Sequence, residues 1–263
     1  MIISKEKYAL MIPAIKKLTR QCTAGLVAML LVCVATPAAA QTIKLATVAP
    51  EGSAWMKDMR AGAKEIEERT AGRVKFKFYG GGVQGNDKQV LRKMRIGQLH
   101  GGAFTSSALG EFEKNAVLYA MPMLFSNLEE VQFARQQMDN KLRNLLEEAG
   151  YVNFGFAGGG FAHLMSNRPI ASLDDMQGLK VWVPDGDHLA YGAAWALGIA
   201  PVTMPLTDVL TGLQTELIDT IMGPAAGTIV LQWNTGVSYI TELPLAYIFA
   251  MLVVDKKYFD RIQ

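Results

Sequence analysis

The 263-residue chain has a formal net charge of +2, with 50% hydrophobic and 19% charged residues. This composition is typical of a globular protein and excludes a disordered or fibrous one. Both cysteines, Cys22 and Cys33, lie in the first forty residues, so the remainder cannot form disulfides, cysteine–zinc sites, iron–sulfur clusters or a cysteine nucleophile. That remainder holds 21 basic and 23 acidic side chains, which argues against nucleic acid as the main partner.

The first forty residues have the composition of a secretory signal peptide. Basic residues at 16, 17 and 20 precede an uncharged run at 21–35, and the alanines at 38–40 satisfy the small-x-small pattern of signal peptidase. We therefore predict cleavage between Ala40 and Gln41. The apolar run is short for a membrane span, so an uncleaved anchor is the less favoured alternative.

The predicted leader implies export. Met1 and Met11 are both candidate start residues. After residue 40 no run of about eighteen apolar residues occurs, and the most apolar stretch, 243–254, contains Pro244. We expect an exported protein, periplasmic in a Gram-negative cell, that does not span a membrane once the leader is removed.

Strand and helix patterns alternate along the rest of the chain. Caps and helical periodicity predict helices from Ser53 to Gly72, from Asp87 to Gly97 and from Asn127 to Gly150, with further helical patterns near 187–197 and 207–216. The repeated alternation predicts an α/β fold with a largely parallel sheet, and the length suits two lobes. The expected strands are 43–48, 74–79, 100–104, 152–156, 161–165, 179–183, 200–204 and 218–222, the fourth and fifth being separated by the glycines 158–160.

One glycine-rich segment resembles a dinucleotide-binding motif. Residues 80–85 match G-x-G-x-x-G between a predicted strand and a predicted helix. The next strand ends in Thr105, Ser106 and Ser107, however, where a ribose-binding acid is expected. An exported protein also meets little dinucleotide. We interpret these glycines as residues that let the chain turn tightly, and we expect no cofactor.

No group of residues indicates catalysis or a bound metal. His100, His163 and His188 lack the spacing of metal ligands, and the sequence Asp-Gly-Asp at 185–187 lacks the further oxygen ligands of a calcium loop. There is no G-x-S-x-G, and no pair of carboxylates stands out from the others. An exported, thiol-free α/β chain of this kind is most simply a ligand-binding protein and not an enzyme.

Seven stretches, taken together and in order, resemble the solute-binding subunits of TRAP transporters, the DctP-like family. The resemblance covers about 43–260, nearly the whole predicted mature chain. The stretches are KLAT at 44–47, EERTAGRV at 67–74, LRKMRIGQL at 91–99, MPMLF at 121–125, SNRPI at 166–170, LDDMQGLKV at 173–181 and LQTELID at 213–219.

The resemblance implies a two-lobed, type II-like periplasmic binding protein with hinge strands and a ligand cleft. Lobe I would comprise 41–158, with 245–263 returning to it, and lobe II would comprise 159–244. Such lobes close around a small solute because the solute contacts both only when they meet. The loaded protein would deliver the solute to TRAP membrane permease subunits driven by an ion gradient, commonly sodium. Most relatives bind organic acids, such as dicarboxylates and sialic acid.

Three polar contact positions of the family are altered in this chain. The family's G-[LI]-K-[IV]-R-[VI]-P segment supplies an arginine that clamps a carboxylate, and Trp182 stands in its place. Ala162 replaces a second arginine found in many relatives, and Gly223 replaces an asparagine. Only a guanidinium offers two parallel charge-assisted hydrogen bonds, so a carboxylate in this cleft would lose its usual partner. Arg168 is a weak candidate for a replacement clamp, because this position varies as a surface residue in relatives.

We therefore expect a cleft of more apolar and aromatic character than in relatives. Suitable ligands would be neutral, aromatic, polyol or amine-bearing solutes, or an acid held by backbone amides at a helix N-terminus. The alternative for Trp182 is a core aromatic on a buried strand. The expected lining residues are Trp182, Phe161, Met222 and Gly223, and the residues expected to orient the ligand are Thr105, Ser106, Ser107, His163, Asp185 and Asp187.

Relatives continue beyond the position of Gln263 with several further helices, so the resemblance implies that the C-terminal helices of the family are missing here. The leading hypothesis is a periplasmic solute receptor for a TRAP transporter. The alternatives are a ligand sensor that docks on a membrane histidine kinase, a degenerate copy that binds nothing and, least favoured, an enzyme.

Overall fold

The computed structural model describes residues 40–114, 117 and 121–262, so the predicted signal peptide lies outside the described residues except for Ala40. Strand β1 begins at Gln41, next to the predicted cleavage site, which itself stays a prediction. The main elements are β1 (Gln41–Thr47), α2 (Ala54–Arg69), β2 (Val74–Tyr79), α3 (Asp87–Arg95), β3 (Gly101–Thr105), α4 (Leu109–Phe112), α5 (Leu128–Glu148), β4 (Tyr151–Ser166), β5 (Trp182–Pro184), α6 (His188–Ala196), β6 (Val202–Met204), α7 (Val209–Gln214), β7 (Thr220–Gly223), α8 (Ala225–Val230), β8 (Tyr239–Ile240), β9 (Ala246–Asp255) and α9 (Lys256–Phe259).

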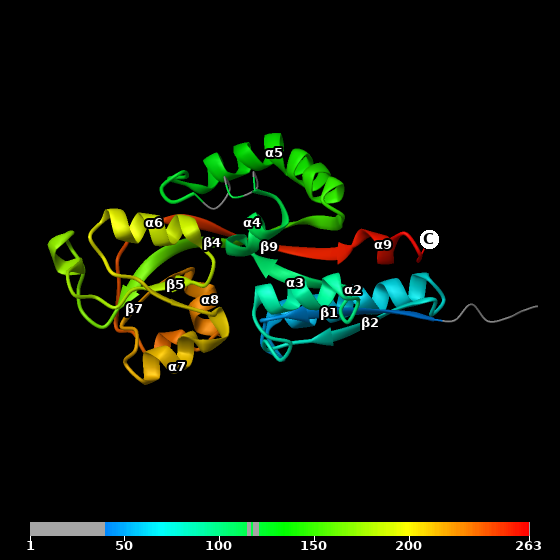
Figure 1. The fold of residues 1–263 in the computed structure, drawn as a ribbon, viewed down its shortest axis with the longest axis horizontal. Helices are drawn as coiled ribbons and strands as arrows, with labels where there is room; N and C mark the ends of the chain where they lie inside the picture. Colours follow the sequence, from blue (N-terminus) through cyan, green and yellow to red (C-terminus); the bar gives the residue numbers. More distant parts are fainter. Residues whose placement is uncertain (1–39, 115–116, 118–120, 263) are drawn as a thin grey trace, which may run out of the picture. The chain divides into compact units, whose positions relative to one another are not determined.

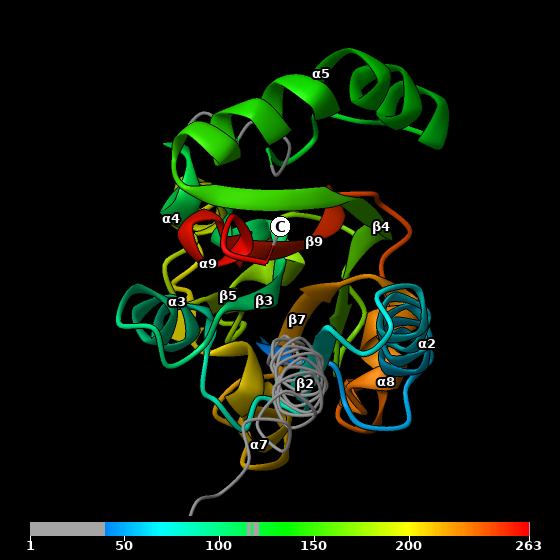
Figure 2. The same ribbon diagram turned by 90° about the vertical axis from the view of Figure 1, so that its right-hand side faces the viewer.

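Two sheets organise these elements. In the larger sheet the strands follow the order β2-β1-β3-β9-β4-β7, with β8 also paired to β4, and β5 pairs with β6 in a second sheet. Strand β1 is parallel to β2 and β3, and β5 is parallel to β6. Helix α5 lies along β4, as both ribbon views show (Figures 1 and 2).

The prediction of a largely parallel sheet is wrong. Strand β9 runs antiparallel to both β3 and β4, and β4 runs antiparallel to β7 and β8. The sequence pattern did not predict β9 as a strand at all, because its apolar residues fill both faces and give no alternation. Its pairing partners are distant in sequence, so no local signal marks it.

A single bent strand replaces the two strands predicted around the glycine run. Strand β4 continues through that run, with register shifts against β9 at 153–156 and 158–160. Gly160 has a φ of 99°, a conformation that a side chain would strain. Asn153 braces the first irregularity, because its side chain accepts from the Gly155 N–H at 2.9 Å and donates to the Leu252 carbonyl at 3.3 Å. The glycines bend the strand without ending it.

Local capping signals are mostly confirmed. The Ser53 hydroxyl accepts from the Met56 N–H, and the Asn127 side chain accepts from the Glu130 N–H. The cap of α3 is Asn86 and not Asp87, because the Asn86 carboxamide oxygen accepts from the Gln89 N–H at 3.0 Å. Asp87 therefore occupies the first helical position and its carboxylate is left for another role.

The buried apolar residues form two groups of clusters. One group gathers residues of the β1–β3 region, α3, α5 and β9 around Phe104, Leu146 and Phe249. The other gathers residues of β5–β7, α7 and the end of β4 around Ile218 and Ile221. Strand β4 contributes to both groups.

Candidate functional site

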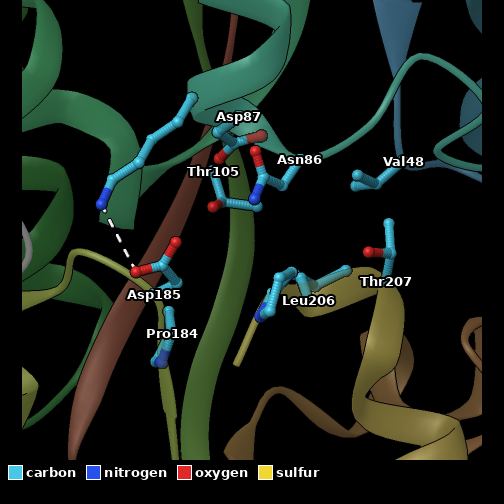
Figure 3. Close-up of a pocket in the computed structure, with 10 residues that line it drawn as sticks. Val48, Asn86, Asp87, Thr105, Pro184, Asp185, Leu206 and Thr207 are labelled. Atoms are coloured by element: carbon cyan, nitrogen blue, oxygen red, sulfur yellow. Dashed lines mark hydrogen bonds and ion pairs between the residues drawn. The ribbon is translucent and has the colours of Figure 1, made fainter. Parts of the chain in front are cut away.

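A small cavity lies where the parallel strands end. Its walls include Val48 directly after β1, Thr105 at the end of β3, Pro184 at the end of β5 and Pro205 directly after β6 (Figure 3). Ligands of open α/β sheets bind outside the carboxyl ends of the strands, so this is the expected place for a site. The volume open to the centres of water-sized spheres is ≈ 30 Å³, which is room for only about two water molecules.

The residues that line this cavity come from elements that pack into both core groups. Asn86, Asp87 and Lys88 come from the start of α3, while Asp185, Leu206 and Thr207 come from the segments after β5 and β6. The glycine-rich turn after β2 also approaches the second group, because a Cβ on Gly82 would lie 2.5 Å from the Thr207 methyl carbon. Gly82 has a φ of 72°, which confirms that these glycines let the chain turn tightly.

The Asp87 carboxylate faces this cavity without a hydrogen-bond or ion-pair partner among the described residues (Figure 3). Burial removes water from around the carboxyl group, and this desolvation raises the pKa of Asp87 from 3.8 to about 7. The first turn of a helix normally favours an anion. Here the desolvation outweighs that effect. A hydrogen-bonding or cationic partner would therefore stabilise the ionised form of the Asp87 carboxyl group.

One ion pair crosses the cavity. The Lys88 Nζ lies 3.4 Å from Asp185 Oδ1, and both side chains are nearly half exposed (Figure 3). Ion pairs with this exposure contribute about 1 kcal/mol or less to stability. The pair therefore contributes little to the stability of the fold. Its main consequence for the site is that the charge of Lys88 is balanced by Asp185.

The structure brings two of the predicted site residues, Thr105 and Asp185, to the cavity. Ser106 sits beside Thr105 but is buried, and its hydroxyl oxygen accepts from the Phe249 N–H at 3.4 Å. The side chain of Ser107 lies outside the described residues. Asp187 caps α6 by accepting from the Ala190 N–H at 2.9 Å, and burial raises the pKa of its carboxyl group despite that bond.

Trp182 lies in the protein interior. The residue is only 4% exposed. Its indole Nε1 donates a hydrogen bond to the Met204 carbonyl at 3.0 Å, and its ring packs edge to face against Trp233. The same carbonyl accepts the Asp185 N–H at 3.2 Å, so the indole supports the strand end that carries Asp185. This placement favours the core-aromatic alternative, and a contact between Trp182 and a solute stays a prediction.

The remaining predicted residues lie along β4 and β7 and do not line the cavity. His163 pairs with Gly223, and its Nδ1 is buried without a hydrogen-bond partner in the described part of the chain. Phe161 meets Tyr247 edge to face at 5.0 Å, and Met222 packs against a buried cluster. Their predicted contacts with a ligand stay predictions.

Sequence reasoning missed several residues of the cavity. Val48, Asn86, Leu206 and Thr207 were not considered, and Asp87 was considered only as a helix cap. Each of them lies at or within a few residues of the end of a predicted strand or the start of a predicted helix. Position at the ends of strands is therefore the signal that could have found them.

Residues 40–114, 117 and 121–262 show neither a metal-ligand cluster nor a membrane-spanning helix. No cluster of three or more His, Cys, Asp and Glu side chains could hold a metal ion there. No helix within the same residues combines the length and apolar character needed to cross a membrane.

Solved structures share this fold. A TRAP periplasmic solute-binding protein from Pseudomonas putida F1 with bound D-glucuronate matches with a TM-score of 0.78 at 20% identity, over 85% of this chain and 74% of that chain. A second, from Roseobacter denitrificans with bound L-galactonate, matches with a TM-score of 0.77 at 24% identity, over 84% of this chain and 74% of that chain.

Sequence comparison agrees with the structural likeness. The chain is 27% identical over 204 residues to a solute-binding protein of Roseobacter denitrificans, covering 76% of this chain and 62% of the relative. It is 25% identical over 199 residues to the C4-dicarboxylate-binding periplasmic protein DctP of Rhodobacter capsulatus, covering 74% of this chain and 59% of that protein. The chain thus spans about three-fifths of the length of these curated relatives.

A family profile matches almost all of the predicted mature chain. The profile is DctP, described as bacterial extracellular solute-binding protein, family 7, and it matches residues 45–263. The mixed α/β fold, with its curled sheet, is that of TRAP periplasmic solute-binding proteins. The chain belongs to family 7 of the bacterial extracellular solute-binding proteins.

Proposed function

We propose that this protein is a periplasmic receptor that captures a small organic solute and delivers it to the membrane permease of a TRAP-type transporter. The observation that carries the proposal is a cavity at the carboxyl ends of the parallel strands, with walls from elements that pack into both groups of buried clusters. Family membership supports the same conclusion. Residues 1–40 would direct export and be removed before Gln41.

The proposed mechanism is closure of two lobes around the solute. Lobe I would comprise 41–158 with 245–263, and lobe II would comprise 159–244, joined through β4 and β9. The cavity has room for only about two water molecules, so a solute the size of a sugar acid requires its walls to separate. A solute that contacts both walls then favours the closed arrangement. Binding without turnover is what this cycle requires, so the protein would not be an enzyme.

Thermal unfolding with a panel of solutes tests this proposal. The panel would hold dicarboxylates, sugar acids, sialic acid, polyols, aromatic acids and amines. A solute at about one hundred times its Kd should add about 2.7 kcal/mol of apparent stability. We expect at least one solute to raise the melting temperature, and uptake of that solute by cells should depend on the protein.

A matched pair of variants ties any shift to the cavity. Leu206→Trp should fill the space beside Asp87 and abolish the solute-induced shift. Leu217→Trp adds the same side chain at a site that is 56% exposed and away from the cavity, so it should keep the shift. Equal shifts in both variants would place binding elsewhere, and no shift with any solute would refute the receptor function.

A further inference from the structure

The charges that line the cavity are unbalanced. Two carboxylates, Asp87 and Asp185, face one cation, Lys88, and the Lys88 ammonium is already paired with Asp185. No arginine lines the cavity in the described part of the chain. The carboxylate of Asp87 is therefore the negative charge that has no counterpart.

The wider surroundings do not supply the missing cation. The charged groups in or next to the cavity walls are Lys88 on α3, Glu111 on α4, Asp185 after β5 and Asp208 beside Thr207. The other basic residues of α3, which are Arg92, Lys93 and Arg95, lie in its last turn and do not line the cavity. The Glu111 carboxylate lies near the Lys88 ammonium, because a Cβ on Gly186 would be 3.9 Å from Glu111 Oε1 and 3.0 Å from Lys88 Nζ. Three of the four groups nearest the cavity are acidic, so the nearest charges oppose an anionic solute.

The positions at which relatives would supply two arginines and an asparagine cannot correct this balance. Ala162 is fully buried and Trp182 is nearly so, with its indole N–H already bonded to a carbonyl. Gly223 has no side chain and faces Thr228 and Trp233. A carboxylate in this cavity would therefore find no guanidinium, and it would lie beside a desolvated carboxyl group.

We propose that the cavity selects solutes that carry a protonated amine, and that the amine nitrogen binds the Asp87 carboxylate. This inference rests on the proposed receptor function and names the class of its solute. An ammonium group supplies both the positive charge and the N–H donors that a partly desolvated carboxylate lacks. Asn86, Thr105 and Thr207 in the same walls suit hydroxyl groups on the remainder of the solute.

Three compounds with one carbon skeleton provide the test. Glucamine, glucitol and gluconate share an open six-carbon polyol chain and differ at one end, which is an ammonium, a hydroxyl or a carboxylate group. Titration calorimetry on the purified full-length protein at pH 7.5 would measure the three affinities. We expect glucamine to bind at least about tenfold more tightly than glucitol, the usual effect of one charge-assisted hydrogen bond, and more tightly still than gluconate.

Two charge-matched variants locate the contact. Asp87→Asn removes the carboxylate with little change of shape and should remove the preference for glucamine over glucitol. Asp58→Asn makes the same change on the exposed face of α2 and should leave all three affinities unchanged. A melting curve of each variant would verify that it folds.

The possible outcomes separate this inference from the receptor function. Tighter binding of gluconate or glucitol in the wild type would overturn the amine preference, while the receptor function would stand. A glucamine preference that survives in Asp87→Asn would overturn the role of Asp87. Failure of all three compounds to bind would overturn the amine proposal, and the broad solute panel would still decide the receptor function independently.

Discussion

Asp87 illustrates how the role of one residue depends on neighbours that are distant in sequence. Its sequence context indicates a helix start, and a helix cap is a reasonable prediction from that context alone. In the structure Asn86 caps the helix, and Asp87 lines a cavity. The opposite wall of that cavity includes Asp185 and Leu206, which lie more than ninety residues further along the chain. No pattern within α3 could show that the carboxylate would be desolvated, because the groups that exclude water come from other segments.

The raised pKa of Asp87 predicts a pH-dependent effect of Asp87→Asn on stability. The folded state holds this proton up to a pH of about 7, whereas the unfolded chain releases it near 3.8. The wild type therefore loses stability as the pH rises through this range, because the folded state binds the extra proton. The asparagine variant has no such loss.

Chemical denaturation of both proteins should show equal stability near pH 4, whereas at pH 8 the variant should be more stable by at most about 4 kcal/mol. Asp58→Asn should show no difference at either pH. A variant that is less stable than the wild type at pH 8 would mean that the carboxylate has a favourable partner in the folded protein.

Trp182 provides a second prediction at this scale. In Trp182→Phe the indole N–H bond to Met204 and part of the contact with Trp233 are lost, but the Met204 carbonyl keeps the Asp185 N–H. We expect the free energy of unfolding to fall by about 1–2 kcal/mol and solute affinity to change by less than about threefold. Trp195→Phe, at a residue that is 68% exposed, should change stability by less than about 0.5 kcal/mol. A large loss of affinity at unchanged stability would instead identify Trp182 as a ligand contact.

At the scale of secondary structure, the elements that could be predicted are those with local signals. The caps Ser53 and Asn127 bond to N–H groups three residues away, so their effect is visible within one turn of sequence. Strand β9 pairs with β3 and with β4, and every paired residue lies more than eighty positions before its partner in β9. Strand direction and order depend on such pairings, which explains why the prediction of a largely parallel sheet failed.

Gly101 tests how closely β3 and β9 approach. A Cβ at this position would clash with the Val253 carbonyl oxygen and lie 2.7 Å from a methyl carbon of Leu45. The first contact is with backbone, so Gly101→Ala should separate the strands and lower the free energy of unfolding by at least about 2 kcal/mol. Gly62→Ala on the exposed face of α2 meets no atom within 4 Å and should raise stability by about 0.5–1 kcal/mol. Equal stability of the two variants in urea would contradict the packing of β3 against β9.

At the scale of the whole described chain, the site is assembled from segments that belong to different buried clusters. Thr105 and Asp185 could be predicted because each stands within two residues of the end of a predicted strand. Their position opposite Asp87, beside Leu206 and Thr207, could not be predicted, because only the meeting of the two cluster groups brings these segments together. The functional consequence is that solute binding should depend on the spacing between those groups.

The last prediction concerns that spacing. If 41–158 with 245–263 and 159–244 act as two lobes, a bound solute should draw them together, because it gains contacts with both walls only when they approach. Small-angle X-ray scattering should then show a smaller radius of gyration with a saturating solute than without it. Leu206→Trp, which fills the cavity, should show no change on addition of the same solute. An unchanged radius in the wild type, with binding verified by calorimetry, would mean that the solute is held without closure, and the hinge role of β4 and β9 would be wrong.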